Sequence, residues 1–422
     1  MIKHGKRAVR ELNTHSVSTH IFNGTDELCQ ERFGFKTAGG RTSSHLAVKA
    51  FSPSPKIGSI SYALELPAIE STIFLTVYGQ IYKWNYEEGT VKNSATLNPV
   101  RMFVAECTYR GENAYTIFGG SQVCFMMKDS QTIINIPYML YCGTFHKGRV
   151  FARDYDDPYL IRWSDYGTSE WTRGLEKGGN VRLNTLGGEV VGMVSFGDKL
   201  ILVRKNAVCV MRASGDVREF SIEQSEAYAV PTVTPFTSVI CGGQLWFHTE
   251  QGLYSFNGHS LSVKPFPDYI KGYTAYNAIS VRGRYVYVNL QSSAGSCVLE
   301  YDTYEDCFTR IASSARFICE LKGKLYCHSG INVLELNADV GSDDYFWRSK
   351  KVDLGTGRCK TLKRLIAEGE GELTYEIDCD GRKRVVRGFG EIAVGERAQA
   401  FTFTVRGTGS LKRLTAEWEV NS

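Results

Sequence analysis

The sequence predicts an all-β fold, in which a β-propeller of six to eight blades is followed by a small C-terminal β-sandwich. Three observations predict it. The 422 residues include 42 glycines and 12% aromatic residues, a mixture typical of many short strands joined by tight turns. A unit of about forty residues, made of two short apolar runs around a turn, recurs along the middle of the chain. Near residue 340 the pattern changes to a cleaner alternation of apolar and polar residues.

The first 55 residues lack regular apolar runs and include the open segment AGGRTSS, so residues 1–55 are expected to form an N-terminal arm or edge segment. Residues 56–340 carry the repeats and are expected to form the propeller. Ring closure in propellers often borrows a strand from another part of the chain. The segment from Lys56 to Leu66, which contains ISYALEL, is expected to supply that closing strand.

Seven repeat units are found in this region, and the segments that define them begin at Thr72, Ala114, Gly148, Asp198, Gly243, Gly283 and Gly323. Their runs are short, are bounded by Gly, Asn and Asp, and lack the spacing of a core-facing helix. Several are apolar at consecutive positions, as in Leu200 to Val203, which is expected of a strand buried on both faces between stacked blades. A β-sandwich or β-solenoid with seven hairpins is the alternative, and the regular spacing favours the propeller.

Residues 345–422 are expected to form the C-terminal β-sandwich. Alternation is clearest at Leu373, Tyr375 and Ile377, as in strands with one solvent-facing side. Turn signals are expected to separate the strands at Gly355 to Gly357, Gly369 to Gly371, Asp380-Gly381 and Gly407 to Gly409.

Composition excludes several classes of function. The net charge of +4 is not gathered into basic blocks, so DNA binding is not indicated, although DNA could pass through a channel without specific binding. The twelve cysteines include no CxxC pair, and Cys124, Cys209, Cys297 and Cys327 lie in apolar runs. They are expected to be reduced core residues of a protein assembled in a reducing cytoplasm. The N-terminus has no secretory signal pattern, and no segment is apolar over a bilayer's width, so membrane insertion is not expected.

The chain is expected to be non-enzymatic and to need no cofactor. Its eight histidines form no zinc motif, and no GxSxG elbow, Walker loop or dinucleotide fingerprint follows a strand. His248 and His328 lie within strand runs and are expected to be hydrogen-bonded core or channel residues. Asp154, Asp156 and Asp157 are the candidate metal ligands, because carboxylates in one turn suit a hard cation. The alternative is a solvated hairpin loop, since the EF-hand spacing is missing.

The stretch RVFARDYDDPYLIRWSDYGTSEW, followed by GDKLILVRKNAVCVMRASG, resembles tailed-bacteriophage virion proteins with a β-propeller body, in particular tail nozzle and tail hub proteins. The shared order is Trp-Ser-Asp at Trp163 to Asp165, a loop ending at Trp171, and a hairpin beginning at Gly197. The similarity covers residues from about 140 to 260, and the rest of the match is architectural. No residue-level role is carried over from that family.

This resemblance implies a structural protein of a phage tail or neck, located in the virion after assembly in the bacterial host cytoplasm. It would form a homo-oligomeric ring, commonly six-fold, at the DNA exit channel, in contact with other tail or portal-proximal adaptor proteins. Two other functions stay open. One is a receptor- or carbohydrate-binding propeller on a particle surface, with Trp171 or Tyr304 stacking on sugars. The other is a glycoside hydrolase, which requires an opposed carboxylate pair in the propeller mouth.

Overall fold

The computed structural model describes residues 17–22, 29–33, 35–38, 41–44, 47–50, 56–85, 90–98, 102–167, 171, 178–267, 270, 273–293, 295–312, 317–329, 331–337, 346–353 and 357–420. The chain divides into two compact units, Leu46–Val340 and a second that combines Met1–His45 with Gly341–Ser422. The segment expected as an N-terminal arm is thus shared between them. Its last strand, β5 (Ala47–Ala50), belongs to the first unit, and its earlier strands belong to the second.

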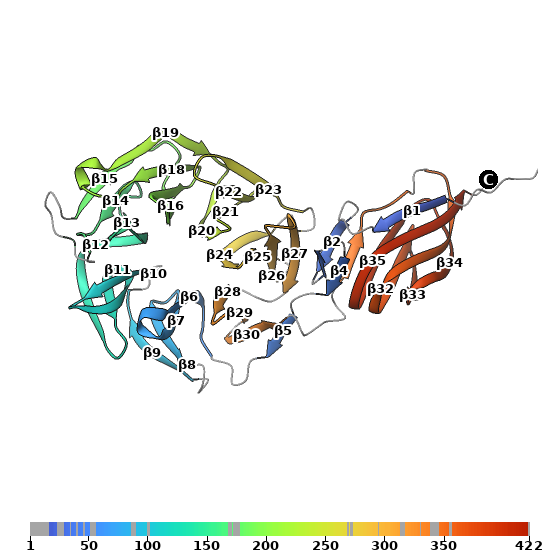
Figure 1. The fold of residues 1–422 in the computed structure, drawn as a ribbon, viewed down its shortest axis with the longest axis horizontal. Helices are drawn as coiled ribbons and strands as arrows, with labels where there is room; N and C mark the ends of the chain where they lie inside the picture. Colours follow the sequence, from blue (N-terminus) through green and yellow to red (C-terminus); the bar gives the residue numbers. More distant parts are fainter. Residues whose placement is uncertain are drawn as a thin grey trace, which may run out of the picture. The chain divides into compact units, whose positions relative to one another are not determined.

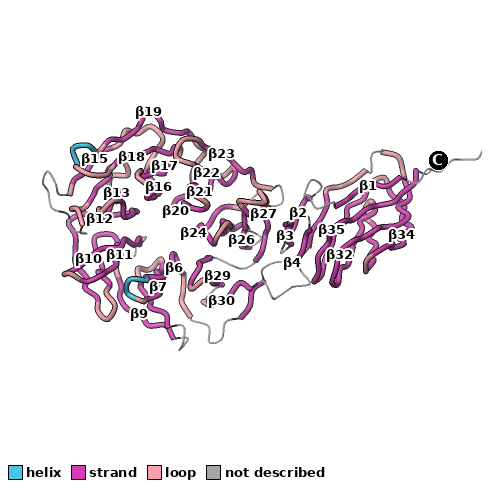
Figure 2. Tube along the Cα trace, in the orientation of Figure 1, coloured by secondary structure: helices cyan, strands magenta, loops and turns pink. Residues whose placement is uncertain are grey.

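The unit Leu46–Val340 is the predicted β-propeller, in which groups of antiparallel strands stand around a common centre (Figure 1). Its further strands are β6 (Ile60–Leu66), β7 (Ser71–Thr76), β8 (Gln80–Asn85), β9 (Thr90–Thr96), β10 (Met102–Tyr109), β11 (Glu112–Met126), β12 (Gln131–His146), β13 (Arg149–Asp154), β14 (Leu160–Trp163), β15 (Gly179–Arg182), β16 (Val190–Phe196), β17 (Lys199–Arg204), β18 (Ala207–Arg212), β19 (Ser221–Ala229), β20 (Val233–Cys241), β21 (Gln244–Thr249), β22 (Gly252–Phe256), β23 (Leu261–Pro265), β24 (Thr274–Arg282), β25 (Tyr285–Ser292), β26 (Gly295–Asp302), β27 (Cys307–Ala312), β28 (Phe317–Leu321), β29 (Lys324–Ser329) and β30 (Asn332–Asn337). Strands joined by loops dominate the described chain, and single turns of helix occur at η1 (Pro67–Ile69) and η2 (Val217–Glu219) (Figure 2).

The predicted hairpins are found at β7–β8, β13–β14, β17–β18, β21–β22, β25–β26 and β29–β30. The unit that begins at Ala114 differs, because both of its runs lie within the single long strand β11. One part of β11 pairs with β10 and the other with β12, with a register shift between Gly120 and Gln122. The strand β12 likewise joins β11 to β13, so one six-stranded sheet holds two repeats.

Burial on both faces explains the consecutive apolar residues. Leu200 and Leu202 of β17 pack in a cluster with Phe151 of the preceding unit. Ile201 and Val203, on the opposite face of the same strand, pack in a cluster that includes residues of β21 and β22. Each blade is therefore sandwiched between its neighbours, and the stacking of blades replaces a single central core.

The ring is closed by β5, which pairs with β30 with Val48 opposite Leu336. The expectation that residues from Lys56 to Leu66 supply the closing strand is wrong, because Ile60–Leu66 forms β6, the first strand of its own sheet. The segment between them still takes part in closure. The amide of Ile57 donates to the Ile331 carbonyl oxygen, and its carbonyl oxygen lies 2.6 Å from His328 Nε2.

The second unit contains β1 (Val17–Phe22), β2 (Cys29–Phe33), β3 (Phe35–Ala38), β4 (Arg41–Ser44), β31 (Phe346–Ser349), β32 (Lys360–Cys379), β33 (Arg382–Arg387), β34 (Gly390–Ala398) and β35 (Phe401–Val420). The two long strands β32 and β35 are antiparallel partners along almost their whole length. At one end they are flanked by β34 and β1, and at the other by β33 and β31. Phe22 of β1 contacts Trp347 of β31 with ring centroids 5.6 Å apart, so the two ends share a core.

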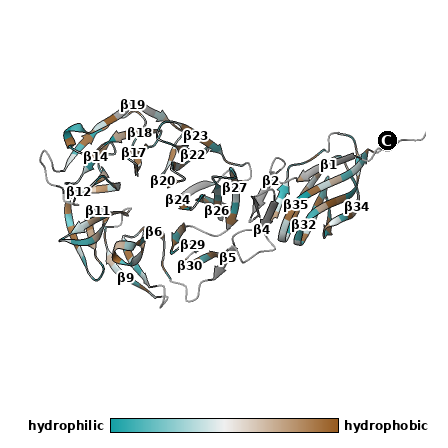
Figure 3. Cartoon of the chain, in the orientation of Figure 1, coloured by the Kyte–Doolittle hydropathy of each residue, from teal (hydrophilic) through white to brown (hydrophobic). Residues whose placement is uncertain are grey.

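Apolar and polar residues alternate along these strands (Figure 3), and Leu373, Tyr375 and Ile377 are buried as the alternation predicts. The turn at Asp380-Gly381 is present, whereas Gly369 to Gly371 and Gly407 to Gly409 lie inside β32 and β35 and form no turn. Gly355 is outside the described residues.

The eleven cysteines from Cys107 to Cys379 are free thiols, and the four predicted core cysteines are all buried. Within the described ranges no helix is long and apolar enough to cross a membrane.

Candidate functional site: the propeller channel and one of its faces

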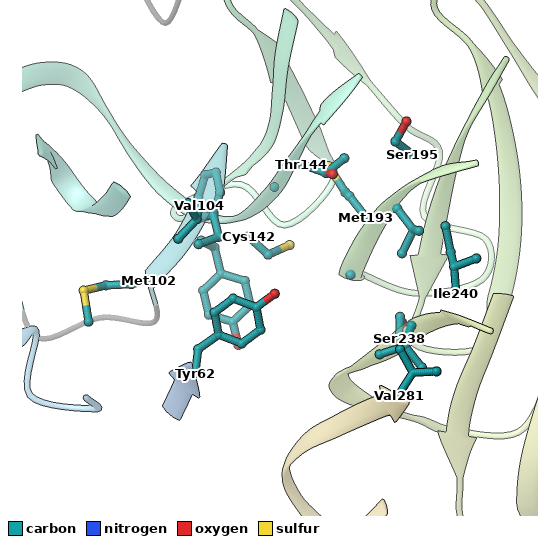
Figure 4. A pocket seen from close by; sticks show the side chains of 16 residues that line it. Tyr62, Met102, Val104, Cys142, Thr144, Met193, Ser195, Ser238, Ile240 and Val281 are labelled. Atoms are coloured by element: carbon teal, nitrogen blue, oxygen red, sulfur yellow. The ribbon is translucent and has the colours of Figure 1, made fainter. Parts of the chain in front are cut away.

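A cavity of about 430 Å³ lies at the centre of the propeller and is lined by sixteen residues (Figure 4). Its walls come from the strands β6, β10, β12, β16, β20 and β24, which belong to successive units around the ring. Because β6, β10, β16, β20 and β24 each lie at the edge of a sheet, and β12 begins the next unit within the six-stranded sheet, residues far apart in sequence meet in one channel. The sequence offered no local signal for this cavity, since no single unit contains more than a small part of it.

The channel lining is mainly apolar and carries no side chain that is charged at neutral pH. None of its sixteen residues is Asp, Glu, Lys, Arg or His. Side-chain hydroxyl groups are supplied by Tyr62, Tyr141, Thr144, Ser195 and Ser238. The walls therefore suit uncharged groups, because an ion buried here would lose hydration without gaining a charged partner.

Two close contacts hold neighbouring walls of the channel together. Ser195 Oγ of β16 lies 2.8 Å from Nδ1 of the buried His146 at the end of β12. Gly143 of β12 lets Phe103 of the preceding unit approach, since a Cβ at this glycine would lie 2.7 Å from the Phe103 ring. These contacts define the wall positions before any ligand arrives.

His146 and His248 are held as uncharged side chains. Burial, with a smaller contribution from the charge of Lys147, lowers the pKa of His146 to about 4. Burial also lowers the pKa of His248 to about 4, and its Nδ1 lies 2.8 Å from Thr234 Oγ1. His328 is buried against the Ile57 carbonyl oxygen. The prediction that His248 and His328 are hydrogen-bonded core residues is confirmed.

The three candidate metal ligands form a hydrogen-bonded turn. Asp154 is buried, and its Oδ1 accepts bonds from the amides of Asp156 and Asp157 at 3.0 and 3.1 Å. Its Oδ2 accepts a bond from Arg162 Nε at 2.6 Å, while Asp157 pairs with Arg182. In the described part of the chain, no group of three His, Cys, Asp or Glu side chains is placed to hold a metal ion.

One face of the propeller gathers two kinds of chain segment, and we call it the connection face. It consists of the turns between the second and third strands of a unit and of the links between units. Hydrogen bonds join the two kinds: the Leu97 amide donates to Gly79, the Lys205 amide to Glu189, and the Asn206 amide to Gly187. Sequence patterns identify these segments as turns but do not reveal that they meet.

Exposed apolar side chains are concentrated on this connection face. Leu186 is 76% exposed, Tyr78 is 62% exposed and Ile331 is 54% exposed, and Val77 and Tyr155 are exposed as well. Among the described loops of the opposite face, the exposed large apolar side chains are Tyr166 and Tyr304. The connection face therefore exposes more large apolar side chains than the described loops of the opposite face, and these side chains come from several units.

The two aromatic residues considered for sugar stacking have different surroundings. Tyr304 is 78% exposed, with the Arg284 guanidinium 5.1 Å from its ring centroid. Trp171 is packed edge-on against Phe118 and Tyr138, with ring centroids 6.3 Å apart in each pair. Only Tyr304 therefore offers an open ring face.

The Trp-Ser-Asp sequence at Trp163 to Asp165 lies at the end of strand β14. Trp163 is buried beside Phe151. Ser164 is buried, its Oγ accepts from the Val150 amide at 2.9 Å, and its carbonyl oxygen accepts from Arg149 at 2.8 Å. Local packing and hydrogen bonding explain these residues, so the motif gives no specific link to tail proteins.

Comparison with solved structures identifies the fold as a β-propeller. The β-propeller domain of Cps50 (Swd1) from Myceliophteria thermophila matches with a TM-score of 0.50 at 11% identity, covering 68% of this chain and 99% of that one. U3-55K matches with a TM-score of 0.46 at 10% identity, covering 69% of this chain and 98% of that chain. The RRP9 WD40 repeats match with a TM-score of 0.47 at 9% identity, covering 69% and 99%. No family model and no curated protein matches the chain.

The interpretation as a bacteriophage tail or neck protein is corrected by this comparison. The solved structure with the highest of these TM-scores is a β-propeller domain of Cps50 (Swd1) and not a tail nozzle or hub. The resemblance to tail proteins, the structural role at a DNA exit channel and the virion localisation are therefore wrong. What the likeness establishes for this chain is the propeller fold.

Proposed function

We propose that the protein is a non-enzymatic binding module whose propeller presents the connection face to a partner protein. The observation that carries this proposal is the concentration of exposed apolar side chains, led by Leu186, Tyr78 and Ile331, on that face. Clustered apolar and aromatic side chains within a polar surround are typical of protein interfaces. The proposal retains a binding function, which the sequence analysis gave as an alternative, without a location on a virus particle.

Hydrogen bonds hold the segments of the connection face in place. The turn that carries Tyr78 is tied to the next link by the Gly79 and Leu97 backbone, and Ile331 is tied to Ile57. The turn that carries Tyr155 is shaped by the Asp154 hydrogen bonds. Because these segments are already ordered, binding would cost little conformational entropy.

The lack of a catalytic pair in the channel supports the non-enzymatic part of the proposal. A glycoside hydrolase needs two carboxyl groups separated by roughly 5 to 10 Å in the propeller mouth. The sixteen lining residues of the channel contain no carboxylate. A partner could also be a second copy of the chain, so the expected homo-oligomer is one form of the proposed binding.

The test compares matched serine variants of the two faces. The triple variant Tyr78→Ser, Leu186→Ser, Ile331→Ser should lose self-association in analytical ultracentrifugation, or lose the protein recovered by affinity enrichment and cross-linking. The variant Tyr166→Ser, Tyr304→Ser on the opposite face should keep that association. Hot-spot residues of this kind each contribute about 2 kcal/mol, so the triple variant should weaken binding by at least about a hundredfold.

Equal binding by the triple variant and the wild type would overturn the proposal. Loss of binding only in the opposite-face variant would also overturn it and would favour a site around Tyr304. Melting temperatures of both variants should stay near that of the wild type, because all five positions are exposed.

A further inference from the structure

The central channel has the dimensions of a small-molecule site. Its volume of about 430 Å³ falls within the range of roughly 300 to 1,000 Å³ found for ligand pockets. Such pockets are lined mainly by apolar side chains with a few polar groups that orient the ligand. The apolar walls here include Met102, Val104, Met193 and Ile240.

We propose that the channel binds one neutral, largely apolar small molecule that carries one or two hydroxyl or carbonyl groups. This site lies at the inner strands, while the proposed protein-binding site lies on the connection face, so the two proposals stand or fall separately.

The absence of charged side chains among the lining residues restricts the class of ligand. No lining residue is an acid or a base that is charged at neutral pH. A carboxylate, phosphate or ammonium group would therefore lose hydration in the channel without gaining a charged partner. An apolar molecule instead gains the free energy of transfer from water.

The polar groups of the walls are placed to orient such a ligand. Tyr62 of β6 is 41% exposed, and Figure 4 shows its hydroxyl group turned into the cavity, across from Ser238 and Val281. Ser238 comes from β20, and Thr144 comes from β12. A hydroxyl or carbonyl group of the ligand can exchange hydrogen bonds with these side chains.

The walls are preformed, which favours binding because little order has to be created. The contact between Ser195 and His146 links two neighbouring walls at 2.8 Å. Gly143 allows the close approach of Phe103 between two others. A preorganised cavity loses less conformational entropy when it takes up a ligand.

The test uses the neutral fluorescent probe N-phenyl-1-naphthylamine with the full chain. Wild-type protein should bind one probe per chain with saturable fluorescence enhancement. Its sulfonated relative 8-anilinonaphthalene-1-sulfonate should bind at least about tenfold more weakly in the channel, because the sulfonate has no cationic partner there. Equal affinities for the two probes would overturn the proposal, as would the absence of saturable binding.

Variants locate the probe. Ile240, 40% exposed, lies in the wall, so Ile240→Asp should weaken probe binding by at least about tenfold. Val263→Asp, the same kind of change at an apolar residue of the outer strand β23 that is 41% exposed, should leave probe affinity unchanged. Should Ile240→Asp fail to fold, Ile240→Trp fills the same space with a neutral ring and should also weaken binding. Unchanged affinity in a folded Ile240 variant would overturn the channel site.

Discussion

The chemistry of single residues in the propeller is dominated by burial. His146 and His248 are 1% and 2% exposed, and the pKa of each is lowered to about 4, mainly by burial. An unperturbed histidine has a pKa of about 6.5. Below that pH, the unfolded chain binds protons that the folded propeller does not bind until pH 4 is approached. These side chains therefore stabilise the fold fully above about pH 6.5 and lose that effect as the pH falls.

The free energy of unfolding should decrease between about pH 6.5 and 4, by at most about 1.4 kcal/mol per pH unit for each of the two histidines. Chemical denaturation at a series of pH values measures this slope. His248→Gln should make the slope shallower by removing one of the two groups. His259→Gln, at an exposed turn position, is the matched control and should leave the slope as it is in the wild type. An identical slope in His248→Gln and the wild type would contradict this explanation.

Among the elements, the long strands of the second unit differ most from what their sequence patterns indicate. Gly369, Gly371, Gly407 and Gly409 read as turn residues, but they lie within the paired strands β32 and β35. There Gly371 is opposite Gly409, Gly369 is opposite Leu411, and Gly407 is opposite Leu373. The register shifts between Glu368 and Gly369. A Cβ at Gly369 would clash with the Ser410 carbonyl oxygen, and one at Gly407 with the Glu372 carbonyl oxygen. These glycines allow the two backbones to lie close together inside the strand pair.

Gly369→Val and Gly407→Ala should each destabilise this unit by about 2 kcal/mol or more, because the added atoms have no room beside the partner backbone. At Gly407 the backbone φ of +119° adds strain for any other residue. Gly357→Ala is the matched control, since nothing lies within 4 Å of its Cβ position and its φ is not positive. Thermal melting compares the three variants. A melting temperature for Gly369→Val as high as that of Gly357→Ala would show that the strands do not need this close approach.

For the propeller as a whole, closure depends on a strand from far away in the sequence. β5 pairs with β30, with Lys49 opposite Glu335 and Val48 opposite Leu336. β5 supplies the outer strand of the last sheet, in the order β28-β29-β30-β5, so the start of the propeller chain holds its last unit in place. The loss of β5 should therefore affect the entire ring, whereas the loss of an ordinary outer strand should affect one sheet.

The double variant Val48→Pro, Lys49→Pro removes two successive backbone donors from β5, so at least one ladder position is lost. It should lower the melting temperature of the propeller and raise its susceptibility to protease. The control Ser262→Pro, Val263→Pro makes the same change in β23, an outer strand that pairs only with its own hairpin neighbour β22. The control should cause the smaller loss. Equal losses in the two double variants would mean that β5 has no special role in closure.

The sequence by itself determined the propeller, because local patterns carry that information. Runs such as Leu200 to Val203 are apolar on both sides of a strand, and the structure buries both sides between neighbouring blades. Buried His248 and the free Cys209 were also predictable, since each lies inside such a run. The Trp-Ser-Asp motif misled because local hydrogen bonding explains it without any common function.

Only the tertiary structure decided which distant segments meet. The pattern of Ala47–Ala50 does not name β30 as its partner, because strand pairing between the two ends of the ring is set by the arrangement of all the blades. Tyr62, Thr144, Ser238 and Ile240 come from three different sheets and share a cavity only when the ring is closed. The exposed residues Tyr78, Leu186 and Ile331 lie on one face for the same reason: successive antiparallel strands return each link to the same face. Local sequence specifies strands and turns, and the geometry of the closed ring specifies the sites.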